Sequence, residues 1–270
     1  MLTGISKARK KNGKIYYRAG ITYRGKHISL GSFDKAREGH AAYKRACEIL
    51  KNTDISFESL FVEDCSSPLS FEKSVILFNF RDNGVYIKNP IYLRKREFSY
   101  FISPQTELKF DVDDLFYYSM HKIMKRQGRL FVNDYGCQTG ILTRYGLSPY
   151  AVKDRDYSFE NGDSTDFRYS NINIINPYHG VRIERKGADI SYSSYLHING
   201  DWKIGNYKTL NEAAIAYNKA VDIAVTCGLD KNYITNYVQE LKPKEYADTY
   251  AGVEISKKLI SYLKSLNCRN

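Results

Sequence analysis

Apolar and polar positions alternate near the start of the chain and then change to a helical period. Residues 14–33 carry two alternating runs joined by YRGK, a pattern that predicts a β-hairpin, and the short run TGISKA before them adds a third strand. From Asp34 onward apolar residues recur at a spacing of about 3.6 residues, so we expect a helix with Asp34 as its N-cap. The apolar stripe of this helix consists of Ala36, Ala42, Tyr43, Ala46, Ile49 and Leu50.

The same pattern returns near the end of the chain. Residues 203–223 align with residues 29–49 without a gap, and Thr209 is the expected cap of the second helix. A repeat whose copies lie this far apart predicts two small domains that flank something else. The matching pairs are Gly31 with Gly205, Phe33 with Tyr207, Ala42 with Ala216, Tyr43 with Tyr217, Ala46 with Ala220 and Ile49 with Ile223. The buried stripe of the second helix would be Leu210, Ala213, Ala214, Tyr217 and Ala220.

The segment between the copies has a less regular pattern. Residues 53–70 contain acids, a Cys-Ser-Ser-Pro break and no clear period, so we expect a linker there. The apolar runs at 74–87 and 96–104 predict strands, and residues 111–128 have a helical period. The residues expected on the inward face of that helix are Leu115, Met120 and Ile123.

Residues 251–270 have their apolar positions on one side of a short helix, with residues 240–246 as the connection to it. A stripe of this kind usually docks on the core of its own protein, and self-association into a homodimer is the alternative. The stripe consists of Val253, Ile255, Leu259, Leu263 and Leu266.

Together the patterns predict an α+β protein with a three-stranded sheet plus helix near each end, a central domain and a C-terminal helix. The expected segments are 1–52, 53–70 (linker), 71–178 (central domain), 179–240 (second copy) and 241–270 (C-terminal helix).

The positive charge is concentrated in the first copy. The chain has a formal net charge of +11. Residues 1–52 contain 13 Lys or Arg against three acids, a net charge of +10, whereas residues 179–226 contain six basic and five acidic residues. A small module with so much excess charge favours a polyanionic partner, and nucleic acid is the usual polyanion inside a cell. A merely solvated basic face is the alternative.

Other features narrow the class of protein. No apolar run approaches the roughly 18 residues that span a bilayer, and the N-terminal residues lack the apolar core of a secretion signal. We therefore expect a cytoplasmic, nucleoid-associated protein of a bacterial or phage-infected cell, without a membrane partner. The cysteines are scattered, odd in number and never in a CxxC pair, which predicts reduced thiols rather than disulfides or a zinc site. They are Cys47, Cys65, Cys137, Cys227 and Cys268.

Both copies share a Gly-Ile or Gly-Val start, a hairpin ending in a Leu-Gly-x-Phe type sequence, and a helix with an A-A-x-A-Y-x-x-A type pattern. These features resemble the DNA-binding domain of plant ethylene-response factors, the APETALA-two type, which also occurs in phage proteins. The resemblance covers roughly 95 residues in all and implies that the sheet lies in the DNA major groove. The family's exposed Trp is absent, since Trp202 falls on the inward phase of its strand and is assigned to the core.

The resemblance also implies which side chains face double-stranded DNA. Arg18 and Arg182 are the candidates for base readout, because bidentate donors are needed there. Most of the other basic residues would contact phosphate. The expected contacts are Lys7, Lys10, Lys11, Lys14, Arg18, Thr22, Arg24, Lys26, His27 and Ser29 in the first copy, and Arg182, Tyr195, His197 and Lys203 in the second.

The central segment SFENGDSTDFRYSNINIIN, residues 158–176, resembles the HNH endonuclease motif of phage homing enzymes. The resemblance implies a ββα unit in which Asn171 begins the helix, and the segment MHKIM at 120–124 would match the helix that precedes the motif. The matching positions are Asn161, Gly162, Asp163, Asp166, Arg168, Asn171 and Ile172.

The catalytic groups of that motif are missing from this chain. Hydrolysis needs a His as general base and ligands for a divalent metal. Phe159 occupies the general-base position, Ser158 occupies a ligand position, and His179 is the one candidate near the distal ligand. We therefore expect no catalytic residue, no metal and no cofactor.

The leading hypothesis is a non-enzymatic, sequence-specific double-stranded DNA-binding protein, an inactive relative of HNH homing endonucleases that acts as a regulator in a phage or mobile element. One alternative is a metal-dependent nuclease or nickase with a non-standard site. Another is a phage factor that binds a host protein. The non-standard site would draw on Asp154, Asp156, Glu160, Asp163 or His179.

Overall fold

The computed structural model describes residues 2–61, 68–187 and 189–267. The protein is α+β, and its chain divides into two compact units. Unit one comprises Met1–Gly140 with Asn161–Asn171, and unit two comprises Ile141–Glu160 with Ile172–Asn270. Within the described ranges, no helix combines the length and the apolar composition needed to cross a membrane.

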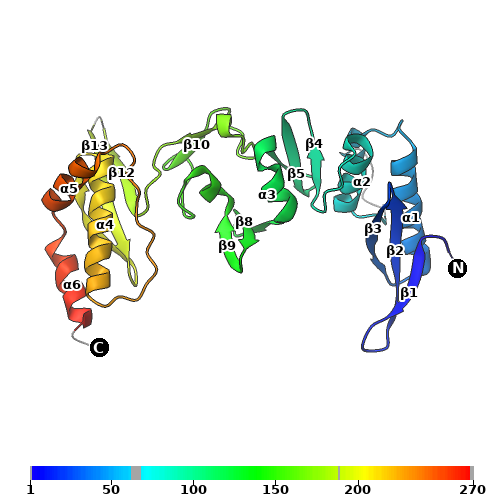
Figure 1. Cartoon of the computed structure of the whole chain (residues 1–270), viewed down its shortest axis with the longest axis horizontal. Coiled ribbons are helices and arrows are strands. Elements are labelled where there is room, and N and C mark those ends of the chain that lie inside the picture. The colour runs from blue at the N-terminus through cyan, green and yellow to red at the C-terminus, as the bar shows by residue number, and fades with distance from the viewer. Residues whose placement is uncertain (1, 62–67, 188, 268–270) are drawn as a thin grey trace. The chain divides into compact units, whose positions relative to one another are not determined.

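Unit one begins with the first predicted sheet and helix, which we call module one. Its three antiparallel strands have the order β1-β2-β3, and α1 covers one face of the sheet (Figure 1). Asp34 does not cap α1, because the N-cap is Lys35 and the Asp34 carboxylate instead pairs with Lys14 Nζ at 3.1 Å. The elements are β1 (Ile5–Arg9), β2 (Ile15–Tyr23), β3 (Lys26–Phe33) and α1 (Ala36–Lys51).

Module one shares its hydrophobic core with α2 (Phe71–Asn83), where the apolar run had predicted a strand. Ser70 caps this helix, accepting a hydrogen bond from Lys73 N, and Gly84 ends it with φ +72°. Nearly every side of α2 is buried, so its sequence lacks the one-sided period of a surface helix, and this is why the prediction was wrong.

The segment expected to be a linker also contributes to this core. A 3-10 turn, η1 (Phe57–Phe61), buries Phe57, whose ring stacks on Tyr92 at 3.8 Å between centroids. Residues 62–67 lie outside the described residues. The expected boundary at residue 52 therefore falls inside unit one, within a continuous core.

The rest of unit one contains two further antiparallel meanders, β4-β5-β6 and β7-β8-β9. The helix predicted over 111–128 is limited to one short helix, after which the chain forms a hairpin at Gln127 and Gly128, both with positive φ. Ile123 is buried as expected, but in a strand, and Met120 is exposed. The elements are β4 (Ile91–Leu93), β5 (Glu97–Ser103), β6 (Thr106–Asp111), η2 (Val112–Asp114), α3 (Leu115–Met120), β7 (Ile123–Arg126), β8 (Arg129–Asp134) and β9 (Cys137–Gly140).

The expected ββα unit is wrong. Phe159 is buried as expected, but β10 pairs with β11, and Asn171 ends a 3-10 turn that leads into this second strand rather than into a helix. The residues after Asn171 explain the difference, because alternating isoleucines favour a strand and Pro177 disfavours a helix. The elements of this region are η3 (Ile141–Tyr145), β10 (Tyr157–Phe159), η4 (Tyr169–Asn171) and β11 (Ile172–Ile174).

Unit two contains the second predicted sheet and helix, which we call module two. The strands have the order β12-β13-β14, and α4 packs on one face (Figure 1). Thr209 caps α4 as predicted, in a capping box with Glu212. The predicted stripe of α4 is buried except for Leu210, which is half-buried. The elements are β12 (Val181–Lys186), β13 (Asp189–His197), β14 (Asp201–Tyr207) and α4 (Leu210–Thr226).

The C-terminal segment forms two helices, α5 (Pro243–Gly252) and α6 (Lys257–Asn267), where one had been expected. Leu259 and Leu263 are fully buried in the core beneath module two. Trp202 lies on the inward face of its strand, as predicted, and stacks on Tyr262 of α6 with 4.0 Å between ring centroids. The apolar stripe of α6 therefore docks on its own unit, which leaves it unavailable for the homodimer considered above.

The two modules repeat one packing contact. Gly4 and Gly180 both have positive φ, +76° and +70°, and a Cβ at either would lie 2.1 or 2.3 Å from the ring of Tyr43 or Tyr217, the paired tyrosines of α1 and α4. The Gly4 carbonyl accepts from Gly20 N at 3.0 Å, and the Gly180 carbonyl accepts in the same way in module two. The repeat seen in the sequence is thus a repeat of tertiary structure.

We predict that Gly4→Ala and Gly180→Ala each destabilise their own unit by about 1–3 kcal/mol, because the new methyl group meets a tyrosine ring and the backbone is left-handed. Gly13→Ala is the matched control, since Gly13 has φ +84° but open space around it, and should cost only about 1 kcal/mol. Equilibrium unfolding in urea measures the differences. Equal losses in all three variants would show that the ring contact has no role.

Candidate nucleic-acid interface

The sheet of module one has one face against α1 and one exposed face. Strand register places Arg18 opposite Ser32 and Thr22 opposite His27 on the exposed face, with Ser29 beside them, so four of the expected contacts share one surface. Thr22 Oγ1 and His27 Nδ1 lie 3.4 Å apart.

Lys7 is not on this face. Register pairs Ser6 with Arg18 and Lys7 with Tyr17, on the side that faces the helix. Ile5 sets this phase, because it packs against the core of module one and side chains alternate along a strand. Ser6 and Ala8 take the positions on the face expected for Lys7, and Lys7 is exposed on the other side of this edge strand.

Arg18 is held in place by Tyr16, a residue that sequence reasoning missed. The guanidinium Nε and Nη2 donate to Tyr16 Oη at 3.0 and 2.6 Å, and the guanidinium carbon lies 5.4 Å from the centroid of the same ring. Both side chains come from β2 at positions i and i+2, which share one face. The spacing Tyr-x-Arg on a predicted strand was the signal that could have identified the pair.

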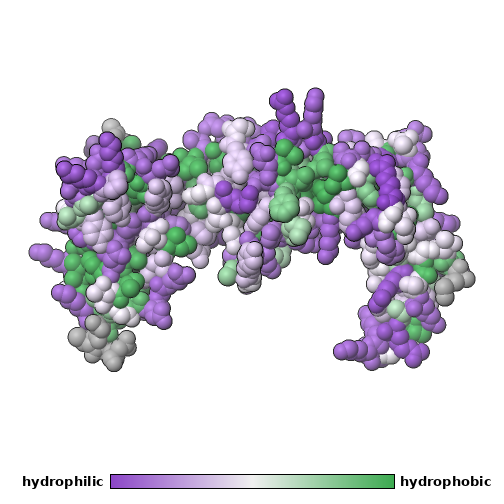
Figure 2. Space-filling model, viewed as in Figure 1, coloured by the Kyte–Doolittle hydropathy of each residue, from purple (hydrophilic) through white to green (hydrophobic). Residues whose placement is uncertain are grey.

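The loop between β1 and β2 adds exposed charge beside this face. Lys10 and Lys11 are exposed, whereas Lys14 is paired with Asp34. Figure 2 shows hydrophilic side chains covering this end of module one. Two of the three loop lysines therefore have no carboxylate partner among the described residues, and the Nζ of one of them, Lys10, lies 5.8 Å from the ring centroid of Tyr16.

Arg24 and Lys26 lie elsewhere, at the turn between β2 and β3. Arg24 stacks on Tyr23 at 5.2 Å, and Lys26 lies 5.0 Å above the ring of Tyr86, outside module one. Both cations therefore lie at the turn end of the sheet, next to the segment that follows α2. They do not belong to the cluster around Arg18.

Acidic residues are absent from the three strands of module one, all of whose residues are described. The exposed face therefore has no carboxylate to offset Arg18. This distribution makes the face attractive to a polyanion over its whole width.

Module two presents the equivalent face with a different charge balance. Arg182, Tyr195, His197 and Lys203 all lie on it as expected, and the Arg182 guanidinium carbon is 4.1 Å from the ring centroid of Tyr195. Sequence reasoning missed Asp201, which pairs with Arg182 and lies 2.8 Å from His197 Nδ1.

These partners decide the ionisation of Asp201. The hydrogen bond from His197 and the contact with Arg182 hold the pKa of Asp201 below its ordinary value, so a negative charge stands on the face. Glu184 also lies here and accepts from the Tyr195 hydroxyl at 3.3 Å. Module two therefore offers little net attraction to phosphate.

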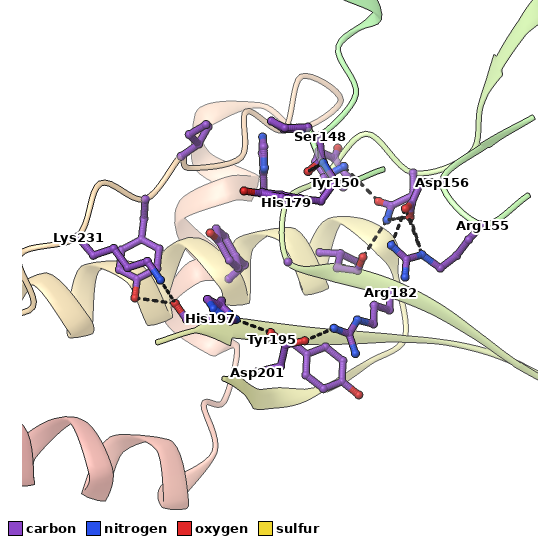
Figure 3. Close-up of a pocket in the computed structure, with 18 of the residues that line it drawn as sticks. Ser148, Tyr150, Arg155, Asp156, His179, Arg182, Tyr195, His197, Asp201 and Lys231 are labelled. Atoms are coloured by element: carbon purple, nitrogen blue, oxygen red, sulfur yellow. Dashed lines mark hydrogen bonds and ion pairs between the residues drawn. The ribbon is translucent and has the colours of Figure 1, made fainter. Parts of the chain in front are cut away.

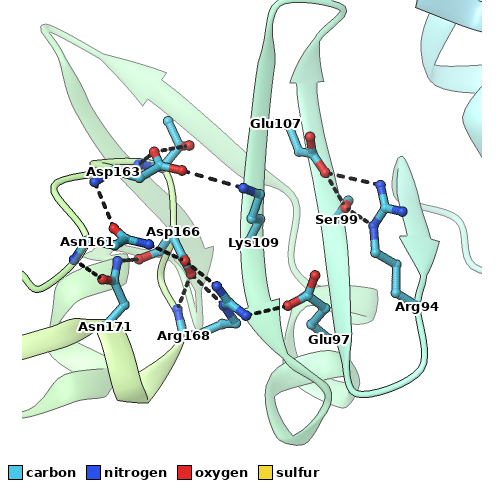
Figure 4. A network of polar contacts seen from close by, with 11 residues as sticks. Arg94, Glu97, Ser99, Glu107, Lys109, Asn161, Asp163, Asp166, Arg168 and Asn171 are labelled. Atoms are coloured by element: carbon cyan, nitrogen blue, oxygen red, sulfur yellow. Dashed lines mark hydrogen bonds and ion pairs between the residues drawn. The ribbon is translucent and has the colours of Figure 1, made fainter. Parts of the chain in front are cut away.

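The polar residues that suggested an HNH motif form a structural network in unit one (Figure 4). Asp166 is fully buried and accepts from Arg168 Nε at 2.8 Å, while Arg168 Nη1 donates to Glu97 at 2.7 Å. Asn171 closes the turn by accepting from Asn161 N at 2.8 Å. The network fastens residues 161–171 to the β5-β6 hairpin, which is a sufficient reason for these residue types at this spacing.

Two of the carboxylates considered for a non-standard nuclease have structural partners. Asp163 accepts from Thr165 N, and Asp156 is buried and accepts from Arg155 and Asn176. In the part of the chain that the structure describes, no three His, Cys, Asp or Glu side chains are placed to hold a metal ion. Cys47, Cys137 and Cys227 are free thiols, and Cys65 and Cys268 lie outside the described residues.

Comparison of the chain with protein-family models, with curated proteins and with solved structures finds no match. The two exposed sheet faces are therefore the features of this chain that bear on its function.

We predict that Asp166→Asn destabilises unit one by about 1–3 kcal/mol at pH 7, because it removes the buried carboxylate of the pair while the half-exposed Arg168 keeps its contact with Glu97. The Arg168 contact lowers the pKa of Asp166, so this stabilisation is present above the unfolded pKa near 3.9 and is lost as the pH falls through the lower folded pKa. Urea unfolding at several pH values should show wild type and variant converging below pH ~3.9.

Asp113→Asn is the control for this prediction, because Asp113 is exposed in the same unit. A variant at Asp166 as stable as wild type at pH 7 would contradict the structural role given to the network.

Proposed function

We propose that the protein binds double-stranded DNA, with module one as the principal contact. The observation that carries this proposal is the exposed face of its sheet. There Arg18 is bonded to Tyr16, the exposed loop lysines Lys10 and Lys11 have no carboxylate partner among the described residues, and the strands contain no acid. An exposed arginine bonded to Tyr16 and flanked by small polar side chains suits a groove, where bases are read by hydrogen bonds and phosphates attract the flanking cations.

The mode of contact follows from the shape of the module. Two strands of a sheet fit into the major groove of B-DNA, and this is the placement that the resemblance to ethylene-response factors implies. Arg18 would donate to the O6 and N7 atoms of a guanine, while Lys10 and Lys11 would contact phosphates and add affinity without sequence preference.

Module two would contribute differently. Asp201 offsets Arg182 and would repel phosphate, yet a carboxylate in the major groove accepts a hydrogen bond from the cytosine N4 amino group. We infer that this face adds little affinity for random DNA and contributes mainly to discrimination among sequences.

A regulatory role in a phage or mobile element stays a hypothesis, supported by the resemblance alone. With the ββα unit absent, relationship to HNH nucleases loses its structural support, and no observation favours the nuclease alternative. The binding of a host protein would be favoured if module one did not bind duplex DNA at low salt.

We predict that neutralising the exposed face, in a Lys10→Gln, Lys11→Gln, Arg18→Gln variant, weakens binding to a random duplex at least about tenfold at low salt. The matched control removes three charges from α1 of the same module, at Arg37, Lys44 and Lys51, all exposed on the opposite side. This control should bind nearly as well as wild type in fluorescence anisotropy. Equal losses in the two variants would show that net charge alone, and not this face, binds DNA.

We predict that Arg18→Ala relaxes sequence preference. On a duplex selected by the wild-type protein from a random pool, the change should cost about 1–3 kcal/mol of binding free energy, because a bidentate base contact is lost. Affinity for unselected duplex should fall much less. A uniform loss on both duplexes would assign Arg18 to phosphate.

A further inference from the structure

Unit two contains a cavity of about 590 Å³ at the point where β12 begins, beside the exposed face of module two (Figure 3). Its walls come from residues 148–150, from the start of β12, from the end of β13 and from residues 231–234, all within one compact unit. This volume lies in the range of sites that take small organic ligands.

His179 lines this cavity with an imidazole that has no hydrogen-bond partner among the described residues. The other four histidines of the chain each have one, from Thr3, Thr22, Tyr117 or Asp201. The His179 side chain is half-buried, and burial lowers its pKa, so at neutral pH one ring nitrogen is a donor and the other an acceptor.

The backbone holds His179 in place although its side chain is unbonded. Its amide donates to Asn236 Oδ1 at 2.7 Å, and its carbonyl accepts from Asn236 Nδ2 at 3.0 Å. Asn236 is itself bonded to Asn218 of α4 through two hydrogen bonds. The backbone position of His179 is therefore fixed, and its imidazole, which has no internal partner, can take a ligand as its hydrogen-bond partner.

The other walls combine aromatic rings with cationic groups. Tyr150 is 72 % exposed at the rim, and Tyr195 and Tyr233 also line the cavity. Lys231 pairs with no carboxylate among the described residues. Its Nζ donates to the carbonyls of His197 at 2.8 Å and Ile198 at 3.4 Å, and lies 5.6 Å from the ring centroid of Tyr233. The two carboxylates in the lining, Asp156 and Asp201, are already paired with arginines.

We propose that this cavity binds a single nucleotide unit, with the base against the tyrosines and hydrogen-bonded through its edge to His179, and the phosphate near Lys231. A planar ring with donors and acceptors on its edge suits a neutral imidazole among aromatic side chains, and one phosphate suits a lysine whose charge no described carboxylate neutralises. The unit is either a free nucleotide or an unpaired nucleotide of bound DNA, and the second case depends on the function proposed above.

The test uses two probes with the full chain. Isothermal titration calorimetry measures the binding of dAMP, dGMP, dCMP and dTMP. Fluorescence anisotropy compares a fully paired duplex with the same duplex carrying one unpaired nucleotide. We expect binding of at least one free nucleotide, or a preference for the duplex with the unpaired nucleotide. His179→Ala should reduce the affinity for the nucleotide, or the preference for that duplex, about tenfold.

A matched pair of tyrosines separates a site effect from a folding effect. Tyr150→Ala removes an exposed ring from the rim and should weaken nucleotide binding, whereas Tyr237→Ala removes a ring that is 84 % exposed and lies outside the lining, and should not. Neither side chain contributes to the buried core of the unit.

The outcomes also separate this inference from the proposed function. If the fully paired duplex binds, but no free nucleotide binds and the unpaired nucleotide gives no preference, the inference is overturned and the proposed function stands. If free nucleotide binds but no duplex does, the inference stands and the proposed function falls. Binding that His179→Ala and Tyr150→Ala leave unchanged would also overturn the inference, because the ligand would then lie elsewhere.

Discussion

In each module, one helix covers one face of a three-stranded sheet, and the close contact of a glycine with a helix tyrosine brings the two layers together. A strand alternates its side chains between two faces, so burying one face beneath the helix determines which residues stand on the other. The exposed positions of Arg18 in module one and of Arg182 in module two both follow from that constraint. The two modules therefore differ in which polar residues occupy the outward-facing positions of their strands.

Those residues give the two exposed faces different charge balances. Module one combines a fixed arginine, exposed lysines and strands without acids, whereas module two places Asp201 between Arg182 and His197. The first arrangement favours attraction to any nucleic acid. The second cancels much of that attraction and leaves hydrogen-bonding groups on the face. Under the proposed function these groups would respond to the identity of a base, while affinity would come mainly from module one.

Period-based prediction succeeded where one face of an element is buried and the other exposed. Strands and helices of both modules, the Thr209 cap and the inward position of Trp202 were all predicted. It failed for α2, which is buried nearly all round and has no one-sided pattern. It also failed for the segment after Asn171, where the spacing of polar residues resembled a motif. In the structure, Asp166 and Arg168 instead attach the turn at residues 161–171 to the β5-β6 hairpin.

The sequence predicts the exposed face less well, because contacts between residues on neighbouring strands depend on a register that the sequence alone does not reveal. The face expected for Lys7 was wrong because the phase of β1 depends on its register with β2. Tyr16 and Asp201 were missed because their importance comes from the arginines they contact, which only a folded sheet brings together.

The salt dependence of duplex binding tests the central claim most directly. If exposed cations of module one contact phosphates, the logarithm of the association constant for random duplex DNA should fall linearly with the logarithm of salt concentration, with a slope of about −3 or steeper. Absence of binding at low salt, or binding whose strength does not change with salt, would contradict this account of the protein.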